Sequence, residues 1–329
     1  MLAAVISEPG GVDRLELRDV PEPAPAPGEL RIAVAYAGLN WGDIQKRQGV
    51  YPDPIAYPAV IGVEVSGIVD ALGPGTREFR LGERVAAITG PRMLGGYAEK
   101  CVLPSSYAFK LPESMPLELA AVFPVAATTA YHLVNTALQP RKGEVLLVHA
   151  IGGAVGLMVT QFAVAKGASV IGTVGSSGKA ALPMAYGAAR VIDRSREDFV
   201  EAANSFTQDK GVDYVIDSLG GDVLERSFDA LRPFGHVVNI GEAAGYPDFD
   251  IRAKLYRRST SLAGFEFLHA GPGSRRWKKA AREIIHGFAE GRWRLPLERV
   301  YPLAEVRSAH ERLESRGVSG KLALRIGGQ

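Results

Sequence analysis

The feature that most constrains this chain is an apolar run that ends in a glycine-containing turn and continues with helical periodicity. Residues 145–148 are four consecutive apolar residues, as in a strand buried on both faces, and residues 157–165 continue at helical spacing. The turn between them reads Ala150-x-x-Gly153-x-x-Gly156. The missing side chains let the backbone approach a pyrophosphate and let the helix pack closely on the strand. The segment therefore predicts a strand, a tight turn and a helix whose N-terminus can hold an anion.

The same pattern repeats along the middle of the chain. Further strand-like segments lie at 168–174, 190–193, 212–217 and 236–241, each separated by a plausible helix. Alternation of this kind predicts a parallel, doubly wound sheet. The glycines of the turn could instead serve helix packing alone, but the repeated units favour a dinucleotide-binding domain.

The chain has a different character on either side of this region. Residues 1–122 are rich in proline and contain short β-forming runs, such as 30–36 and 60–69, broken by glycine-containing turns. This pattern predicts an all-β, partly open barrel. The doubly wound sheet is assigned to residues 123–264, and residues 265–329 are expected to pack back on the N-terminal domain and complete it. The predicted fold class is α/β.

Several elements outside the central sheet also follow from the sequence. A helix is expected over residues 119–134, although Pro124 should kink or restart it. An amphipathic helix is expected over residues 277–290, and its apolar face holds Ala281, Ile284, Ile285 and Phe288. Three shorter elements are a strand at 261–267, a helix at 305–315 and a strand at 321–326.

Composition narrows the classes of protein and site. The chain has 329 residues and a formal net charge of +2, which argues against a dominant polyanionic partner. No stretch of about eighteen apolar residues escapes a charge, proline or glycine, so a membrane span is not expected. The opening residues fit a strand better than a signal peptide, which predicts a cytoplasmic enzyme. The single cysteine, Cys101, excludes an intrachain disulfide and a four-thiolate zinc site.

Short motifs along the whole chain point to a family. They lie at 37–43, 62–67, 82–85, 95–98, 148–156, 217–220 and 320–322. Together they resemble the zinc-independent quinone oxidoreductases of the medium-chain dehydrogenase/reductase superfamily. The resemblance implies a GroES-like catalytic domain, a Rossmann domain, NADPH as cofactor and a homodimer.

Two departures from the zinc-dependent members of that superfamily bear on the chemistry. Asn40 stands where those alcohol dehydrogenases have a cysteine, and Val63 stands where they have a histidine. Glu64 would be the one ligand left from that set, so no metal site is expected. An acceptor whose reduction needs no Lewis acid, such as a quinone or an activated alkene, fits better.

The choice between NADH and NADPH can be argued from charge. A Rossmann site specific for NAD carries an acid about twenty residues beyond the glycines, and residues 174–179 contain none. A 2′-phosphate would instead meet two hydroxyls, the Lys179 ammonium and Arg194. Lys179 could also be simply the first solvated residue of a helix. The full set expected beside NADPH is Thr129, Ala150, Gly152, Gly153, Ala154, Val155, Gly156, Gly175, Ser176, Lys179, Arg194, Ser218, Gly241, Phe265 and Lys321.

The catalytic assignments rest more on the resemblance, which implies that Asn40, Asp43 and Tyr51 line the substrate and nicotinamide pocket. Asn40 can donate a hydrogen bond to a substrate oxygen, and Tyr51 can donate one or relay a proton. Asp43 could equally cap a helix. The resemblance places Glu64 where the family keeps an acid near the cleft, but Glu64 could equally form a buried ion pair.

The favoured activity is hydride transfer from NADPH to a quinone or similar conjugated carbonyl held between the lobes. A reductase of enals, enones or enoyl thioesters would share the fold and the cofactor. A different class is a non-catalytic NADPH-binding or RNA-binding protein. The basic cluster Arg275, Arg276, Lys278, Lys279 and Arg282 could serve RNA, but such a cluster on an amphipathic helix is more often a solvated face, so nucleic-acid binding is not expected.

Overall fold

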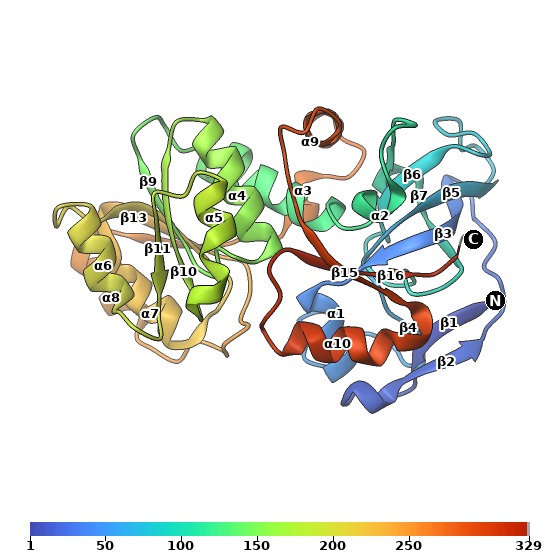
Figure 1. Cartoon of the computed structure of the whole chain (residues 1–329), viewed down its shortest axis with the longest axis horizontal. Coiled ribbons are helices and arrows are strands. Elements are labelled where there is room, and N and C mark those ends of the chain that lie inside the picture. Colours follow the sequence, from blue (N-terminus) through green and yellow to red (C-terminus); the bar gives the residue numbers. More distant parts are fainter. Residues whose placement is uncertain (328–329) are drawn as a thin grey trace. The chain divides into compact units, whose positions relative to one another are not determined.

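The computed structural model describes residues 1–327 and divides into two compact units. Unit 1 comprises Met1–Thr128 and Ala270–Gln329, and unit 2 comprises Thr129–His269. Each unit contains its own sheet (Figure 1). Within the described residues, no helix has both the length and the apolar composition needed to cross a bilayer.

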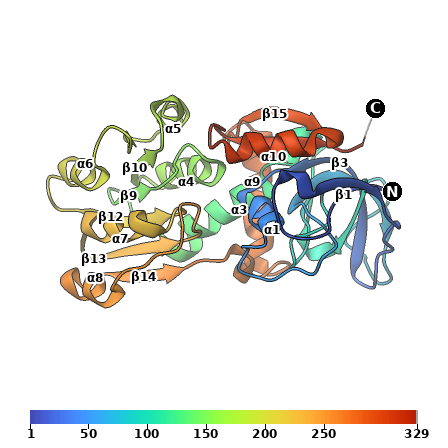
Figure 2. The same cartoon turned by 90° about the horizontal axis from the view of Figure 1, so that it is seen from below.

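Unit 2 is built on a six-stranded parallel sheet with the strand order β11-β10-β9-β12-β13-β14. The order runs outward in both directions from β9, as the doubly wound prediction requires. Figure 2 shows β9, β12 and β13 following one another across this sheet. The strands are β9 (Val145–Val148), β10 (Ser169–Val174), β11 (Arg190–Asp193), β12 (Val212–Asp217), β13 (Leu231–Asn239) and β14 (Ser261–Gly264).

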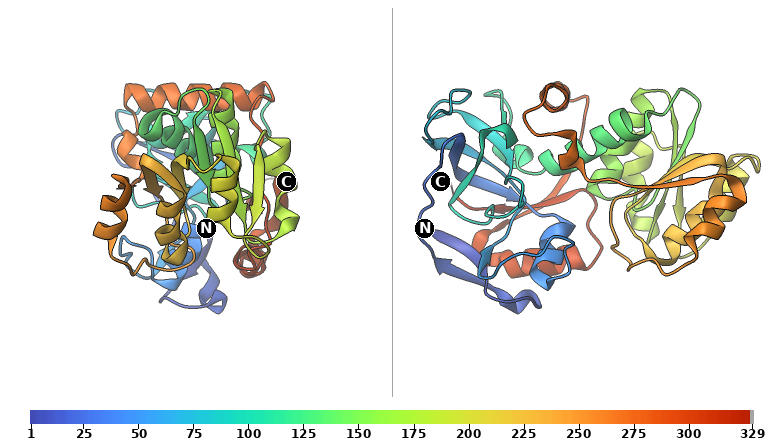
Figure 3. Two further views of the ribbon diagram at one scale, coloured as in Figure 1. Left: turned by 90° about the vertical axis from the view of Figure 1, so that its left-hand side faces the viewer. Right: turned by 180° about the vertical axis from the view of Figure 1, so that it is seen from behind.

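Helices lie on both sides of these strands (Figure 3). Their bounds are α4 (Ala154–Ala165), α5 (Ala181–Ala185), α6 (Phe199–Phe206), α7 (Gly221–Ala230) and α8 (Ile251–Arg258), with a π-helical segment at Leu133–Leu138 and 3₁₀ turns at Ser177–Lys179 and Phe267–Ala270. Leu147 of β9 joins the hydrophobic cluster that holds Phe199 of α6 and Phe228 of α7. Its neighbours Leu146 and Val148 are also buried, and alternation along a strand directs them to the opposite face. This explains why the strand reads as a continuous apolar run.

Unit 1 has a seven-stranded sheet with the path β15-β16-β3-β5-β6-β8, in which β7 also pairs with β3. A separate three-stranded sheet has the order β2-β1-β4. Because β16 runs antiparallel to β3, the last segment of the chain completes the sheet of the N-terminal segment. The strands are β1 (Leu2–Ile6), β2 (Leu15–Asp19), β3 (Glu29–Gly38), β4 (Ala59–Val60), β5 (Glu64–Leu72), β6 (Arg84–Ile88), β7 (Lys100–Pro104), β8 (Ala108–Lys110), β15 (Leu297–Pro302) and β16 (Lys321–Arg325).

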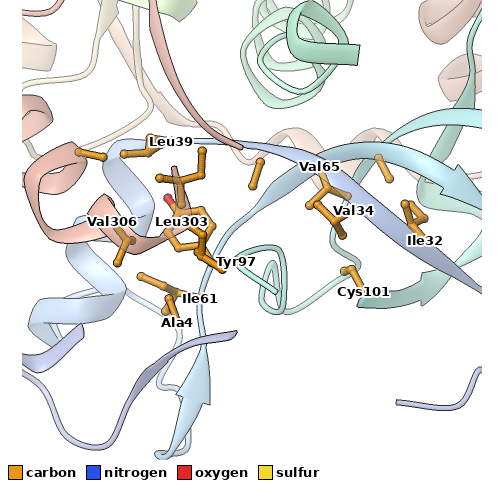
Figure 4. Close-up of a cluster of buried hydrophobic side chains, with 14 of the residues drawn as sticks. Ala4, Ile32, Val34, Leu39, Ile61, Val65, Tyr97, Cys101, Leu303 and Val306 are labelled. Carbon is orange, nitrogen blue, oxygen red and sulfur yellow. The ribbon is translucent and has the colours of Figure 1, made fainter. Parts of the chain in front are cut away.

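The core of unit 1 joins the main sheet to helix α10. Figure 4 shows Val34 of β3 and Val65 of β5 in one cluster with Tyr97 and Val306. The helices that begin in unit 1 are α1 (Trp41–Gln48), α2 (Leu117–Ala120), α3 (Pro124–His132), α9 (Arg275–Ala289) and α10 (Val306–Glu314), with 3₁₀ turns at Val12–Arg14, Ser105–Tyr107 and Leu303–Glu305. Pro124 does restart the helix expected over 119–134, because proline is tolerated in the first turn but not inside a helix.

Helix α9 corrects one prediction about its buried face. The buried residues are Trp277, Ala280, Ile284, Gly287 and Phe288, whereas Ala281 and Ile285 are half-buried. The apolar pattern missed Gly287, which has no side chain and lets Trp293 pack against the helix backbone. The basic residues of α9 are exposed. One of them, Lys278, forms an ion pair of 2.9 Å with Glu78. This arrangement agrees with a solvated charged face.

Candidate cofactor and substrate sites

The turn after β9 has the geometry that the glycine spacing predicts. Ala150 adopts a left-handed φ of 51°, and Gly153 is the N-cap of α4. A Cβ on Gly156 would lie 2.6 Å from the Ile151 Cα, so only glycine fits there. The first backbone N–H groups of α4 have no acceptor within the helix, as at every helix N-terminus. These donors and the positive end of the helix dipole can hold a dinucleotide pyrophosphate.

A buried histidine braces this turn. His149 Nδ1 lies 2.9 Å from the Thr173 Oγ1 on β10, and its Nε2 lies 2.9 Å from the Ser227 Oγ on α7. Ser227 already donates its hydroxyl hydrogen to the Val223 carbonyl, so Nε2 must be the donor and Nδ1 the acceptor. Burial lowers the pKa of His149 to about 3, which keeps the ring neutral. Nothing near His149 in the sequence indicates these contacts, because its partners lie 24 and 78 residues along the chain.

The region expected to bind a 2′-phosphate also contains an acid. Asp193, at the end of β11, accepts hydrogen bonds from the Ser177 Oγ at 2.6 Å and from the Ser195 Oγ at 2.7 Å. These hydrogen bonds, that from Ser177 first, lower its pKa to about 2. The residues directly after β10 include no acid. Asp193 belongs to the next strand, β11, so the comparison with NAD-specific sites did not find it. Asp193 is engaged by serine hydroxyls, and a cavity of about 340 Å³ opens beside Arg194 and Ser195.

Two more strand ends are fixed next to one another. Asp217 at the end of β12 accepts hydrogen bonds from the backbone of Leu219 and Gly220 and from the side chain of Asn239 on β13. Burial raises the pKa of Asp217. A Cβ on Gly241 would lie 3.5 Å from the Ser218 carbonyl oxygen, so these two predicted cofactor residues are adjacent. The backbone N–H of Phe265 donates to the Asn239 carbonyl, which brings a third predicted residue to this edge.

In unit 1, Asn40 occupies the N-cap of α1 and is held at both its backbone and its side chain. The Asp43 Oδ2 accepts the Asn40 backbone N–H at 2.9 Å, and it also accepts the Tyr97 hydroxyl at 2.9 Å. Asp43 is fully buried, and burial raises its pKa to about 6. Of its two open interpretations, the structure shows the helix-capping contact.

The Asn40 side chain contacts a buried ion pair. Its Nδ2 donates to the Glu64 Oε1 at 2.8 Å, and its Oδ1 accepts from the Lys321 Nζ at 2.8 Å. Lys321 also donates to the Glu64 Oε1 and to the Leu39 carbonyl, both at 2.5 Å. The three N–H groups of this ammonium therefore all have protein acceptors. The cofactor contact predicted for Lys321 stays a prediction, and no sequence signal linked Lys321 to Asn40.

Two other predicted residues have less specific settings. Tyr51 is half-buried, and the Lys46 ammonium lies 4.4 Å from the centre of its ring, within cation–π range. Thr129 lies on α3 and is buried. The roles of both residues stay predictions.

Comparison with known proteins adds to this geometry. Residues 26–113 match the family model for the alcohol dehydrogenase GroES-like domain, and residues 154–286 match the zinc-binding dehydrogenase model. The quinone oxidoreductase of Pseudomonas aeruginosa is 34% identical over 322 residues, which cover 96% of each chain. A 2-haloacrylate reductase from a Burkholderia species is 30% identical over 337 residues, which cover 98% of each chain. The crystal structure of Escherichia coli quinone oxidoreductase complexed with NADPH matches with a TM-score of 0.94 and 30% identity, covering 99% of this chain and 100% of that one.

The chain belongs to the quinone oxidoreductase family of the medium-chain dehydrogenase/reductase superfamily. This confirms the predicted family, the GroES-like and Rossmann domains and the assignment as an oxidoreductase. The glycine turn and the relatives together support a nicotinamide cofactor.

The donors of this quinone oxidoreductase family member do not suit a zinc ion. Among residues 1–327, no group of three or more His, Cys, Asp or Glu side chains is placed to hold a metal. Glu64 accepts hydrogen bonds from Asn40, Lys321 and the backbone of Val125. Cys101 is buried among hydrophobic side chains. That the reaction needs no metal stays a prediction.

Proposed function

We propose that this protein is an NADPH-dependent quinone oxidoreductase that works without a metal. The observation that carries the proposal is the glycine turn at α4, whose N-terminal N–H groups can hold the pyrophosphate of a dinucleotide. When bound, NADPH supplies a hydride. With one proton, the quinone takes up that hydride and becomes a hydroquinone, while NADPH becomes NADP⁺.

Three residues support NADPH over NADH. Lys179 closes the 3₁₀ turn after β10, close enough that a Cβ on Gly152 would lie 3.0 Å from its carbonyl oxygen. Ser176 is the N-cap of the same turn, and Arg194 borders the cavity that follows β11. An ammonium and a guanidinium on this edge suit a 2′-phosphate. The nearby acid Asp193 already accepts hydrogen bonds from Ser177 and Ser195. We therefore do not assign it the role of the acid that binds the ribose hydroxyls in NAD-specific sites.

The substrate oxygen is assigned to Asn40. An amide N–H in a partly buried site can bind the carbonyl oxygen that gains negative charge during hydride transfer. Tyr51 or water delivers the proton. A planar quinone needs no cationic anchor, whereas an acyl thioester carries phosphates that would need one, so small quinones are the proposed acceptors.

The cofactor assignment is tested by Lys179→Ala. One charge-assisted hydrogen bond is worth about 1.5–3 kcal/mol, so we expect the Kd for NADPH to rise about tenfold or more and the Kd for NADH to stay nearly constant. Lys142→Ala is the matched control, because Lys142 is exposed in the turn before β9, at the opposite end of the strands. Equal losses for both cofactors in Lys179→Ala would contradict the assignment.

The acceptor assignment is tested by comparing kcat/KM for small quinones, enals and enoyl thioesters. We expect quinones to react fastest. The second candidate is an activated-alkene reductase, which the similarity to a 2-haloacrylate reductase favours. Efficient reduction of an enoyl thioester beside negligible quinone turnover would establish that candidate and displace ours.

We also propose a homodimer in the cytoplasm. The edge strand β14 is exposed along its length in this chain, and Leu262 on it is 37% exposed. An open edge of this kind can pair with a second copy. Light scattering on the purified protein should give twice the mass of one chain, and the monomer mass would exclude the dimer.

A further inference from the structure

The Asn40 side chain lies against the buried ion pair of Glu64 and Lys321. Its carboxamide forms a closed triangle with Glu64 and Lys321, with edges of 2.8, 2.8 and 2.5 Å between the polar atoms. The side chains of the ion pair are 0% exposed for Glu64 and 3% exposed for Lys321. The other oxygen of Glu64 is held in turn by the backbone N–H of Val125 at 2.8 Å. The carboxylate is therefore held in place from one side and accepts the Asn40 amide on the other.

The chemistry of these partners dictates which way the amide faces. An ammonium can only donate, so the Asn40 atom beside Lys321 must be the oxygen. A carboxylate can only accept, so the atom beside Glu64 must be the nitrogen. Both partners require the same orientation, which removes the ambiguity that an asparagine amide otherwise has. Glu64 accepts one of the two N–H groups on Nδ2, so that atom carries one further donor.

We propose that Glu64 and Lys321 are positioning residues that hold the Asn40 amide as a hydrogen-bond donor toward the substrate. This inference rests on the proposed function and concerns how its substrate-binding amide is held. A site that presents an N–H selects an acceptor atom, such as the carbonyl oxygen of a quinone or enone. It gives no matching partner to a group that can only donate.

The energetic cost of the pair supports a role beyond folding. Burying a carboxylate and an ammonium carries a large desolvation penalty, and a pair of apolar residues of similar volume often gives a protein that is at least as stable. Here the charges touch the one side chain assigned to the substrate oxygen. The positions of the two charges determine which way the dipole of the Asn40 carboxamide points, and a pair of apolar residues could not do this.

The test is the double variant Glu64→Gln/Lys321→Met. It removes both charges together, which avoids leaving either one buried alone. The Val125 N–H needs an oxygen acceptor at position 64, so the nitrogen of the introduced carboxamide lies toward Asn40 and favours the reversed amide. We expect kcat/KM for the quinone to fall about tenfold, as for losing one hydrogen bond to developing charge, with the Kd for NADPH unchanged. A rise in that Kd would instead place Lys321 at the cofactor and overturn the proposal.

A double-mutant cycle separates positioning from a general structural effect. Asn40→Ala should also lose about tenfold in kcat/KM, and the triple variant should lose the same tenfold because the pair acts through Asn40. Losses that multiply to about a hundredfold would show independent roles and refute the inference. The control is Asp70→Asn/Lys100→Met, which removes another ion pair of unit 1, between β5 and β7, at 2.6 Å. It should leave kcat/KM unchanged.

Two further measurements keep the test decisive. The side-chain amide signals of Asn40 in a ¹H–¹⁵N NMR spectrum, assigned by their loss in Asn40→Ala, should shift strongly in the double variant. This readout does not need turnover, so it holds even where the wild type fails to reduce quinones and the proposed function fails. Unshifted signals would refute the positioning role. Where the double variant does not fold, Lys321→Arg keeps the charge but changes the reach of the donor, and it should shift the same signals.

Discussion

Replacing Asp43 by asparagine should change how the stability of unit 1 depends on pH. The carboxyl is fully buried, and its Oδ1 has no hydrogen-bond partner among residues 1–327. Burial raises its pKa from an ordinary 3.8 to about 6, against the smaller opposing effects of Lys46, Asn40 and Tyr97. Asparagine resembles the protonated acid in shape and is neutral at every pH.

The sign and size follow from the two pKa values. Between pH 3.8 and about 6 the folded protein keeps a proton on Asp43 that the unfolded chain has lost. The stability that this proton provides is fully present below pH 3.8 and disappears as the pH rises through 6. The separation of the two pKa values corresponds to about 3 kcal/mol. The free energy of unfolding of the wild type, minus that of Asp43→Asn, should therefore fall by about 3 kcal/mol between roughly pH 3.5 and 7.5.

Urea unfolding followed by tryptophan fluorescence suits this measurement. All three tryptophans, at positions 41, 277 and 293, lie in unit 1 with Asp43, so the signal reports that unit. The matched control is Asp53→Asn, the same substitution at an exposed position on the loop after α1. A difference for Asp43→Asn that is constant, or that grows as the pH rises, would refute the reasoning.

Three other outcomes can be checked on the same protein. Burial raises the pKa of the Cys101 thiol to about 12, so a thiol-reactive dye should label the native protein very slowly and label it at once in urea. Gly156→Ala places a Cβ 2.6 Å from the Ile151 Cα, and we expect the displaced turn to raise the Kd for NADPH about tenfold, measured by nucleotide fluorescence. Dialysis against a strong chelator should leave quinone turnover intact, and loss of activity that zinc restores would show a metal site.

The parts of the fold that could be predicted are those encoded by neighbours in the sequence. The continuous apolar run at 145–148 and the glycines after it specify a buried strand and a tight turn, because burial on both faces and a close helix are local requirements. Pro124 marked a helix start for the same local reason. The apolar pattern predicted only part of the buried face of α9. Gly287 belongs to that face because Trp293 packs against it, but glycine has no apolar side chain to indicate this.

The parts of the site that could not be predicted depend on register between distant segments. Lys321 reaches Glu64 across 257 positions, and nothing near either residue indicates the other. Antiparallel pairing puts Gly38 of β3 opposite both Glu64 of β5 and Ala323 of β16, and this brings the two side chains to the same end of β3. Asp193 reaches Ser177 in the same way, from a neighbouring strand.

The surroundings of Asn40 argue for a rigid donor and not merely for a helix cap. An N-cap asparagine needs only its own side chain and one backbone N–H of the first helical turn. Here Asp43 adds the reciprocal contact of a capping box to the Asn40 backbone, and Glu64 and Lys321 also contact the carboxamide. Two carboxylates and an ammonium are thus buried around one neutral residue. A donor fixed before the reaction loses little energy to reorientation when charge develops on the bound oxygen. The burial of Asp43, Glu64 and Lys321 around Asn40 therefore fits the proposed role of its amide as a fixed donor.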